Sequence, residues 1–107
     1  MAGAVIVLRQ AERDLEEIYD FVESHDGPGA AERFRAGLGN ALVSLSTLPA
    51  RGNVVRELRS LGVTDYREIR WTLYRIVYRI TSERVVVHCV LDGRRDIPTI
   101  LQRRLLR

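Results

Sequence analysis

Residues 65–96 read DYREIRWTLYRIVYRITSERVVVHCVLDGRRD and contain three short runs in which apolar and polar side chains alternate. A period of two is typical of a strand whose two faces meet different surroundings. In the run from Tyr74 to Ile80, tyrosine and isoleucine share one face, whereas Arg75 and Arg79 lie on the other. We therefore expect three consecutive antiparallel strands with a packed apolar face and a face that carries arginines.

The run 84–92 pairs with the strand before it through a predicted two-residue turn at residues 82–83. His88 then lies on the arginine face, about 7 Å from both Arg75 and Arg79, because this is the spacing of diagonal neighbours in a sheet. A slip of one residue would bury both arginines in the apolar side. The turn predicts these directly opposite pairs: Ile76 and Cys89, Val77 and His88, and Tyr78 and Val87.

The run 66–71 pairs in the same way around residues 72–73. This pairing places Ile69 and Trp71 in the core. It also gathers cations and one carboxylate on the other face, which we expect to be only partly covered: Glu68, Arg70, Arg75, Arg79 and His88.

The composition is that of a globular protein with an unusual choice of cation. The chain has 107 residues, of which 46% are hydrophobic and 29% charged, and a formal net charge of +3. All 17 basic residues are arginine, a bias that a GC-rich genome also produces without functional cause. No apolar run reaches the roughly 18 residues of a membrane span, and the amino terminus does not have the pattern of a signal peptide. We expect one cytoplasmic domain spanning residues 1–107.

The remaining elements follow from apolar periodicity. Residues 2–8 read as a strand, residues 10–24 and 30–48 as amphipathic helices, and residues 53–58 as a short strand within a long connection. Asp96 is expected to cap a final helix with Pro98 in its first turn. This order indicates a two-layer α+β fold, in which an antiparallel sheet packs on a helical hairpin and a short C-terminal helix follows.

The arginine face suits a polyanion, either RNA phosphates or an acidic protein surface. The alternative is that these charges protect a sheet edge from aggregation or pair with nearby carboxylates. In a metal-free RNA cleavage site, Arg75 and Arg95 would hold the phosphate and His88 would act as base or acid. Glu68 is a further base candidate, or an ion-pair partner of Arg70.

Other chemistries lack their sequence signals. There is no glycine-rich phosphate loop, no Ser/His/Asp order and no His/Asp cluster with metal-ligand spacing, so we expect no cofactor and no metal. The single Cys89 reads as a small core residue on the packed side of its strand, which leaves no disulfide and no cysteine zinc site to expect.

Several short motifs follow one another in a characteristic order: AERDLEEIYDFV, the Leu48–Pro49 pair, DYREI, YRIVYRI, VVVHCVLDGRRD and the closing LQRRLL. In order and spacing they resemble the RelE/ParE superfamily of toxins from bacterial type II toxin–antitoxin modules, over nearly the whole chain. The resemblance implies a compact α+β toxin that inhibits growth until a cognate antitoxin neutralises it by wrapping an extended or helical tail around it.

Two activities occur in that superfamily. RelE-like members are ribosome-dependent mRNA endonucleases, whereas ParE-like members, which include plasmid-stabilisation toxins, poison DNA gyrase. Arg75 and Arg95 match the two arginines of the nuclease pattern. Its two lysines fall at Glu68 and Arg70, and its tyrosine falls at Leu101. Because these groups are lost, we favour a ParE-like gyrase poison over an mRNA interferase or a non-toxic antitoxin-binding remnant.

The resemblance also implies partners and site residues. The partners are a cognate antitoxin and either DNA gyrase or the translating ribosome with mRNA, with no membrane. A homodimer and a heterotetramer with the antitoxin are both compatible. Catalytic roles apply only to a nuclease and fall to Arg75, Arg95, His88 and Glu68. The residues expected to bind the target or phosphate are Arg70, Arg75, Arg79, Arg94 and Arg95.

Overall fold

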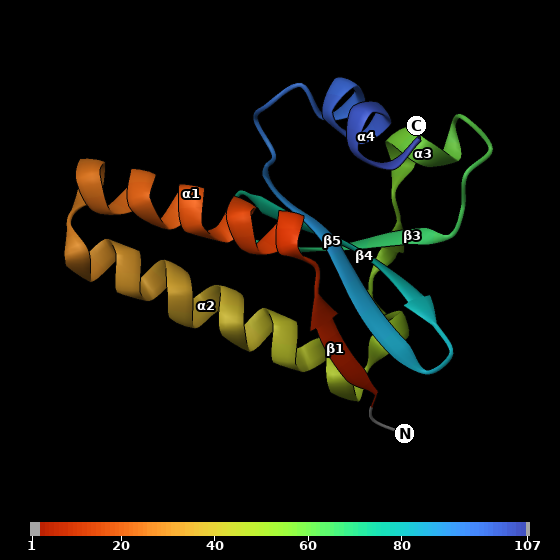
Figure 1. The fold of residues 1–107 in the computed structure, drawn as a ribbon, viewed down its shortest axis with the longest axis horizontal. Helices are drawn as coiled ribbons and strands as arrows, with labels where there is room; N and C mark the ends of the chain where they lie inside the picture. The colour runs from red at the N-terminus through yellow and green to blue at the C-terminus, as the bar shows by residue number, and fades with distance from the viewer. Residues whose placement is uncertain (1–2, 107) are drawn as a thin grey trace.

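The computed structural model describes residues 3–106. It has the predicted α+β architecture, and the strands predicted at residues 66–71, 74–80 and 84–92 are present to within one residue. Figure 1 shows the elements, which run as follows: β1 (Ala4–Val7), α1 (Arg9–Asp26), α2 (Pro28–Thr47), a 3₁₀ turn (Pro49–Arg51), β2 (Asn53–Val54), α3 (Arg56–Arg59), β3 (Tyr66–Trp71), β4 (Tyr74–Thr81), β5 (Arg84–Asp92) and α4 (Ile97–Leu105).

The five strands form one sheet in the order β1-β5-β4-β3-β2. The last three strands of the chain are consecutive antiparallel neighbours, as predicted, while β1 runs parallel to β5 at one edge. Ser82 and Glu83 form the predicted turn between β4 and β5, with φ of 45° and 67°. Positive φ at both positions gives a two-residue turn the twist that matches its strands.

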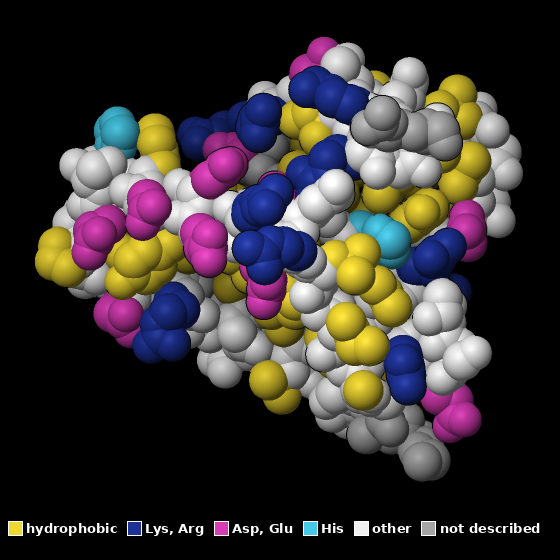
Figure 2. Space-filling model, viewed as in Figure 1, with side chains coloured by type: hydrophobic (Ala, Val, Ile, Leu, Met, Phe, Trp, Pro, Cys, Tyr) yellow, Lys and Arg dark blue, Asp and Glu magenta, His cyan; other side chains and the backbone are white. Residues whose placement is uncertain are grey.

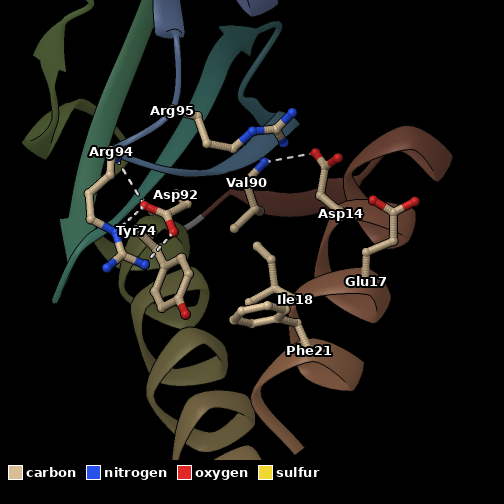
Figure 3. A pocket seen from close by; sticks show the side chains of 9 residues that line it. All are labelled: Asp14, Glu17, Ile18, Phe21, Tyr74, Val90, Asp92, Arg94 and Arg95. Atoms are coloured by element: carbon tan, nitrogen blue, oxygen red, sulfur yellow. Dashed lines mark hydrogen bonds and ion pairs between the residues drawn. The ribbon is translucent and has the colours of Figure 1, made fainter. Parts of the chain in front are cut away.

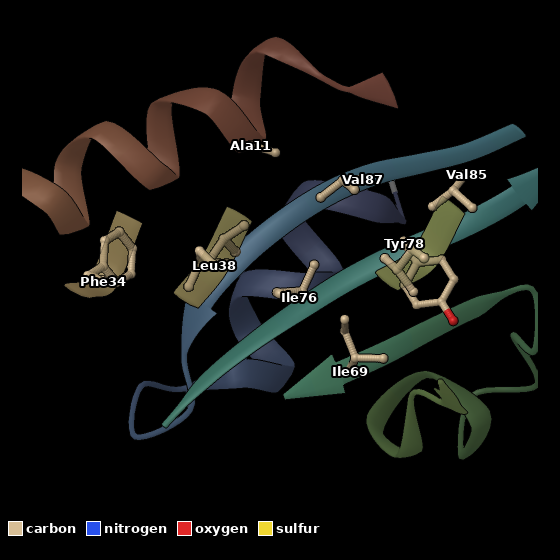
Figure 4. Close-up of a cluster of buried hydrophobic side chains, with 10 residues drawn as sticks. Ala11, Phe34, Leu38, Ile69, Ile76, Tyr78, Val85 and Val87 are labelled. Atoms are coloured by element: carbon tan, nitrogen blue, oxygen red, sulfur yellow. The ribbon is translucent and has the colours of Figure 1, made fainter. Parts of the chain in front are cut away.

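The helical hairpin α1–α2 covers one face of the sheet (Figure 1). Gly27, with φ of 93°, ends α1, and Pro28 opens α2, where its missing N–H has no helical partner to lose. Gly37 lets the ring of Trp71 lie directly against α2, because a Cβ at this position would overlap that ring. The buried side chains between hairpin and sheet form the main core (Figure 4): Ala11, Phe34, Leu38, Leu45, Ile69, Ile76, Tyr78, Val85, Val87 and Val90.

Helices α3 and α4 cover part of the opposite face. Asp96 caps α4 as predicted, accepting the Thr99 N–H at 3.4 Å and the Thr99 hydroxyl at 2.8 Å. The face that carries the arginines is covered further than the sequence suggested, because these two helices bury a second apolar cluster on it: Val55, Leu58, Tyr66, Val77, Cys89, Leu91, Ile97, Ile100 and Leu101.

A β-bulge at His88 changes the predicted register. Tyr78 pairs with Val87 as expected, but His88 has no partner on β4. One extra residue inverts the faces beyond it, so Cys89 turns toward the second cluster instead of the helical hairpin. It is still a core residue, and burial raises the pKa of its thiol to about 11. The pairs beyond the bulge therefore differ from the prediction: Val77 with Cys89, and Ile76 with Val90.

The long connection before β3 is more structured than its sequence suggested. The strand predicted at residues 53–58 is limited to Asn53–Val54, and the chain then turns into α3. Among the described residues, no helix combines the length and the apolar character that crossing a membrane requires.

Candidate functional site

Arg75, the residue central to the predicted arginine face, is buried with an exposed fraction of 3%. Its Nη1 and Nη2 donate to the two carboxylate oxygens of Glu57 on α3, both at 2.7 Å. Its Nη2 and Nε also donate to Glu68 on β3, the former at 2.9 Å. These hydrogen bonds hold the pKa of Arg75 above its usual range, and those to Glu57 have the largest effect. One buried cation is therefore shared between two carboxylates, and it is not exposed to a ligand as the sequence suggested.

The Arg75–Glu57 pair predicts a loss of stability in acid. Hydrogen bonding to Arg75 lowers the pKa of Glu57 from 4.5 to about 2. The ionised carboxylate therefore stabilises the fold above about pH 4.5, and this contribution is lost as the pH falls toward 2. In urea titrations from neutral to acid pH, Glu57→Gln should start less stable than the wild type and decline less steeply. Parallel pH profiles for the two proteins would contradict this role.

His88 lies beside Tyr66 and Arg79, on the part of the outer sheet face that α4 leaves half-covered. The rings of His88 and Tyr66 meet edge-on with their centroids 5.2 Å apart. The Arg79 guanidinium lies over the Tyr66 ring, 5.6 Å from its centroid. Burial, then the charges of Arg79 and Arg104, lower the pKa of His88. The bulge also separates His88 from Arg75, which pairs with Leu91. The structure thus keeps Arg79 with His88 but does not bring them to Arg75.

Arg94 and Arg95 lie in the turn after β5, beside a cavity of about 240 Å³ (Figure 3). Arg94 donates to both oxygens of Asp92, at 3.1 and 2.8 Å, and so holds the pKa of that carboxyl below its usual range. Arg95 is exposed and forms no ion pair with any described residue. Apolar side chains of α1 and β4 line the other wall: Ile18, Phe21 and Tyr74.

A second cavity, of about 350 Å³, opens on the other side of Arg95 between α1 and α4. The two cavities share Asp14, Glu17 and Arg95, and we call the surface that they form the α1–α4 groove. Asp14 on α1 connects this helix to β5 and α4, because it accepts the Val90 N–H at 3.0 Å and pairs with Arg104 at 3.1 Å. In Figure 2, basic side chains gather over the start of α1 and over α4, and acidic ones follow α1.

The α1–α4 groove combines both signs of charge with an apolar wall. This mixture is typical of a surface that contacts another protein, where an apolar centre gives affinity and the surrounding charges give specificity. A site for a bare polyanion would not carry an exposed carboxylate that lacks an ion-pair partner among the described residues, as Glu17 does. Arg94 and Arg95 are the predicted site residues that the structure brings to this groove.

Arg70 occupies a third location. It is exposed on β3, opposite Arg75 in the pairing of the two strands, and lines a cavity at the β2 edge of the sheet. Three structural residues near the site were not predicted from the sequence: Glu57, which binds Arg75, and Arg104 and Asp14, which pair with each other, Arg104 also donating to the His88 carbonyl. Asp14 and Arg104 are far apart in the chain, and nothing in the local sequence pattern connects them. Within residues 3–106, no group of three or more His, Cys, Asp or Glu side chains is placed to hold a metal ion.

Comparisons with known proteins agree with this fold. The model of the family described as the ParE toxin of the type II toxin–antitoxin system, parDE, matches residues 5–97. A chain of the chromosomal ParDE toxin–antitoxin system from P. aeruginosa superposes with a TM-score of 0.68 at 18% identity, covering 83% of this chain and 94% of that one. A chain of the toxin–antitoxin complex RelBE2 from Mycobacterium tuberculosis gives 0.60 at 27% identity, covering 84% and 96%. No curated protein sequence is a significant match.

Proposed function

Because this chain belongs to the ParE toxin family of type II toxin–antitoxin systems, we propose that it inhibits growth by binding and poisoning DNA gyrase rather than by cutting mRNA. The observation that carries the proposal is the sequestration of Arg75 by Glu57 and Glu68. A nuclease would need this cation to stabilise negative charge on a phosphate in the transition state. Because the N–H groups of the guanidinium are hydrogen-bonded to two carboxylates, that role would require breaking two buried ion pairs.

The final helix supports the same proposal. Leu101, which stands where the nuclease pattern has a tyrosine, is fully buried in the second apolar cluster. It packs α4 against the sheet and offers no proton for a leaving group. The burial that lowers the pKa of His88 also favours its neutral form at pH 7, so it is a poor general acid there. A ribosome-dependent nuclease remains the alternative that the experiment below distinguishes.

We assign target binding to the α1–α4 groove, with Arg95 as its principal cation. Arg95 is exposed at the junction of the two cavities, whereas Arg94 is already held by Asp92. An uncommitted guanidinium beside an apolar wall can hold a carboxylate of a protein target bidentately at little cost in desolvation.

We also infer that a cognate antitoxin covers the chain, since both structural relatives come from toxin–antitoxin complexes. An apolar cavity of about 350 Å³ between the exposed sides of α1 and α2 offers a place for apolar anchors of such a partner. Leu15, Tyr19 and Leu42 line it, and Glu16 and Arg35 lie at its margin. Buried apolar anchors within a polar border are the usual source of affinity in such interfaces.

Two assays on the purified chain separate the two activities. We expect inhibition of supercoiling by purified gyrase, and no cuts in mRNA when primer extension follows translation on ribosomes. Ribosome-dependent cuts without gyrase inhibition would overturn the proposal. Absence of both activities from a folded chain would instead identify a non-toxic remnant.

A charge change in the groove tests its role in target binding. Arg95→Gln should raise the concentration needed for half-inhibition of gyrase by about tenfold or more, because a hydrogen bond to a charged group is worth about 1.5–3 kcal/mol. Arg84→Gln is the matched control, since Arg84 is also exposed but lies at the start of β5. Equal potency of Arg95→Gln and Arg84→Gln would place the target contact elsewhere.

A further inference from the structure

A second basic surface lies at the β2 edge of the sheet, apart from the α1–α4 groove. Here a cavity of about 580 Å³ is lined by Arg56 and Arg59 from α3 and by Arg67 and Arg70 from β3. Arg51 lines an adjoining cavity that shares Gly52, Asn53, Glu68 and Arg70 with the first. We call these five arginines the β2-edge cluster: Arg51, Arg56, Arg59, Arg67 and Arg70.

The β2-edge cluster concentrates positive charge that the neighbouring residues do not neutralise. No member forms an ion pair with a carboxylate among residues 3–106. The two carboxylates beside the cluster, Glu57 and Glu68, share Arg75 and so leave one negative charge against the five cations. Five cations in one place exceed the formal net charge of +3 of the whole chain, so the rest of the molecule balances to a small negative charge. The cluster therefore creates a local positive field that an anion in solution would feel.

The cluster is also partly organised in advance. Arg67 donates its Nη1 to the Gly52 carbonyl at 2.7 Å, and Arg51 donates to the Ser44 hydroxyl at 2.6 Å. These bonds fix two guanidinium groups at the border of the cavity, while the exposed Arg56, Arg59 and Arg70 form no such bond among the described residues. Arg67 and Arg70 are three residues apart on one strand, so their Cα atoms are about 10 Å apart and their side chains leave opposite faces of β3, both lining the cavity at the sheet edge. The surface is therefore wide enough to contact more than one anionic group at a time.

The lining of the cavity distinguishes phosphates from an acidic peptide. Val54 is the only apolar side chain among the residues that line the larger cavity. A peptide segment gains most of its affinity from apolar anchors, and this surface has no pocket to receive them. A phosphodiester backbone needs only closely spaced cations and hydrogen-bond donors, and guanidinium groups match its oxygens bidentately.

Aromatic side chains are likewise missing from both cavities of the β2 edge. Proteins that hold single-stranded nucleic acid stack bases on exposed aromatic rings, so the lining favours a duplex, whose bases are already stacked. From these observations we infer that the β2-edge cluster binds the phosphate backbone of a nucleic-acid duplex without reading its sequence. This site is independent of the protein target assigned to the α1–α4 groove.

Fluorescence anisotropy with a labelled 20-base-pair duplex DNA of arbitrary sequence tests the inference, with an RNA duplex of the same sequence as a second arm. The variant Arg56→Gln/Arg59→Gln/Arg70→Gln removes three exposed cations whose guanidinium groups form no hydrogen bond within the described residues, and leaves the bonded Arg67 and Arg51 in place. At about 100 mM salt it should bind the DNA duplex at least tenfold more weakly than the wild type. The negative slope of log affinity against log salt should become shallower by about 2.7, because three phosphate contacts and their released counterions are lost.

The matched control is Arg9→Gln/Arg33→Gln/Arg84→Gln, which removes the same charge from three exposed arginines elsewhere. It should bind the duplex within about twofold of the wild type. Equal weakening of both variants would show that only net charge matters and would overturn the site. Binding of a glutamate-rich peptide in preference to either duplex, with loss in the first variant alone, would assign the cluster to an acidic protein instead.

The result of this binding test does not depend on whether the proposed inhibition of gyrase is correct. A chain that fails to inhibit gyrase but binds duplex DNA through these three arginines leaves the inference standing. A chain that inhibits gyrase but binds neither duplex at about 50 mM salt overturns it. Comparison of the two duplex arms shows whether the backbone recognised is that of DNA, of RNA or of both.

Discussion

Replacing Arg75 by alanine should lower the free energy of unfolding by about 3–5 kcal/mol, the usual cost of removing one partner from a buried ion pair. The side chain is 4% exposed, and its partners Glu57 and Glu68 are 15% and 12% exposed. Without the guanidinium, two largely buried carboxylates would face each other with no counterion. Urea unfolding followed by circular dichroism measures the change.

Two further variants make the cause of this loss explicit. Arg84→Ala removes an exposed arginine on β5 and should change stability by less than about 0.5 kcal/mol. Adding Glu57→Gln and Glu68→Gln to Arg75→Ala should recover part of the loss, because the unpaired charges disappear with their partner. If Arg75→Ala alone cost less than about 1 kcal/mol, the ion pairs would not be buried in solution.

This expectation changes how an Arg75 variant can be used. Loss of toxicity in Arg75→Ala would follow from partial unfolding whatever the target, so it does not by itself identify a nuclease site. The folded fraction has to be measured first, and cleavage compared at equal concentrations of folded protein. The groove variant Arg95→Gln avoids the difficulty because its side chain is exposed.

Replacing Phe34 by alanine should cost about 3–5 kcal/mol, the range for truncating a buried phenylalanine. Phe34 is 4% exposed and packs edge-on against Tyr74 at 5.1 Å and Trp71 at 6.0 Å, at the point where α2 meets the ends of β3 and β4. The Gly37 that admits Trp71 lies one turn further along α2. A cavity here would therefore loosen the attachment of the helical hairpin to the sheet.

Phe21 offers the matched control in the same helical hairpin. It is 57% exposed and stacks only on His25 at 4.0 Å, so Phe21→Ala should cost less than about 1 kcal/mol. The two variants lose the same atoms and differ only in burial. Similar losses in urea unfolding for both would contradict the assignment of Phe34 to the main core.

Much of the fold was predictable because the signals are local. The helices at residues 10–24 and 30–48 and the three consecutive strands follow from spacings of three to four and of two residues, which reflect the geometry of a single element. The Asp96 cap is local in the same way, because its side chain accepts hydrogen bonds from Thr99, three positions further along the chain. The family also follows from motif order, and the match over residues 5–97 confirms it.

The candidate site was predictable only as a set of residue types. Alternation correctly placed Arg75 and Arg79 on the face opposite Tyr78, but it carries no information about what covers that face. The bulge at His88 is also invisible to alternation, since Val86, Val87, Val90 and Leu91 are apolar on either parity. The three arginines expected on one face thus lie in separate places: Arg75 is buried, Arg79 lies beside Tyr66 and Arg70 lies at the β2 edge.

The sequence by itself determined which segments are helices and strands, the pairing of the last three strands and the concentration of all basic charge in arginine. Only the tertiary structure decided that α3 brings Glu57 to Arg75, that α4 brings Arg104 to Asp14, and that five other arginines meet at the β2 edge. The physical reason is that periodicity reports the surroundings of one element at a time. Pairing of charges depends instead on side chains distant in sequence that chain folding brings within hydrogen-bond distance.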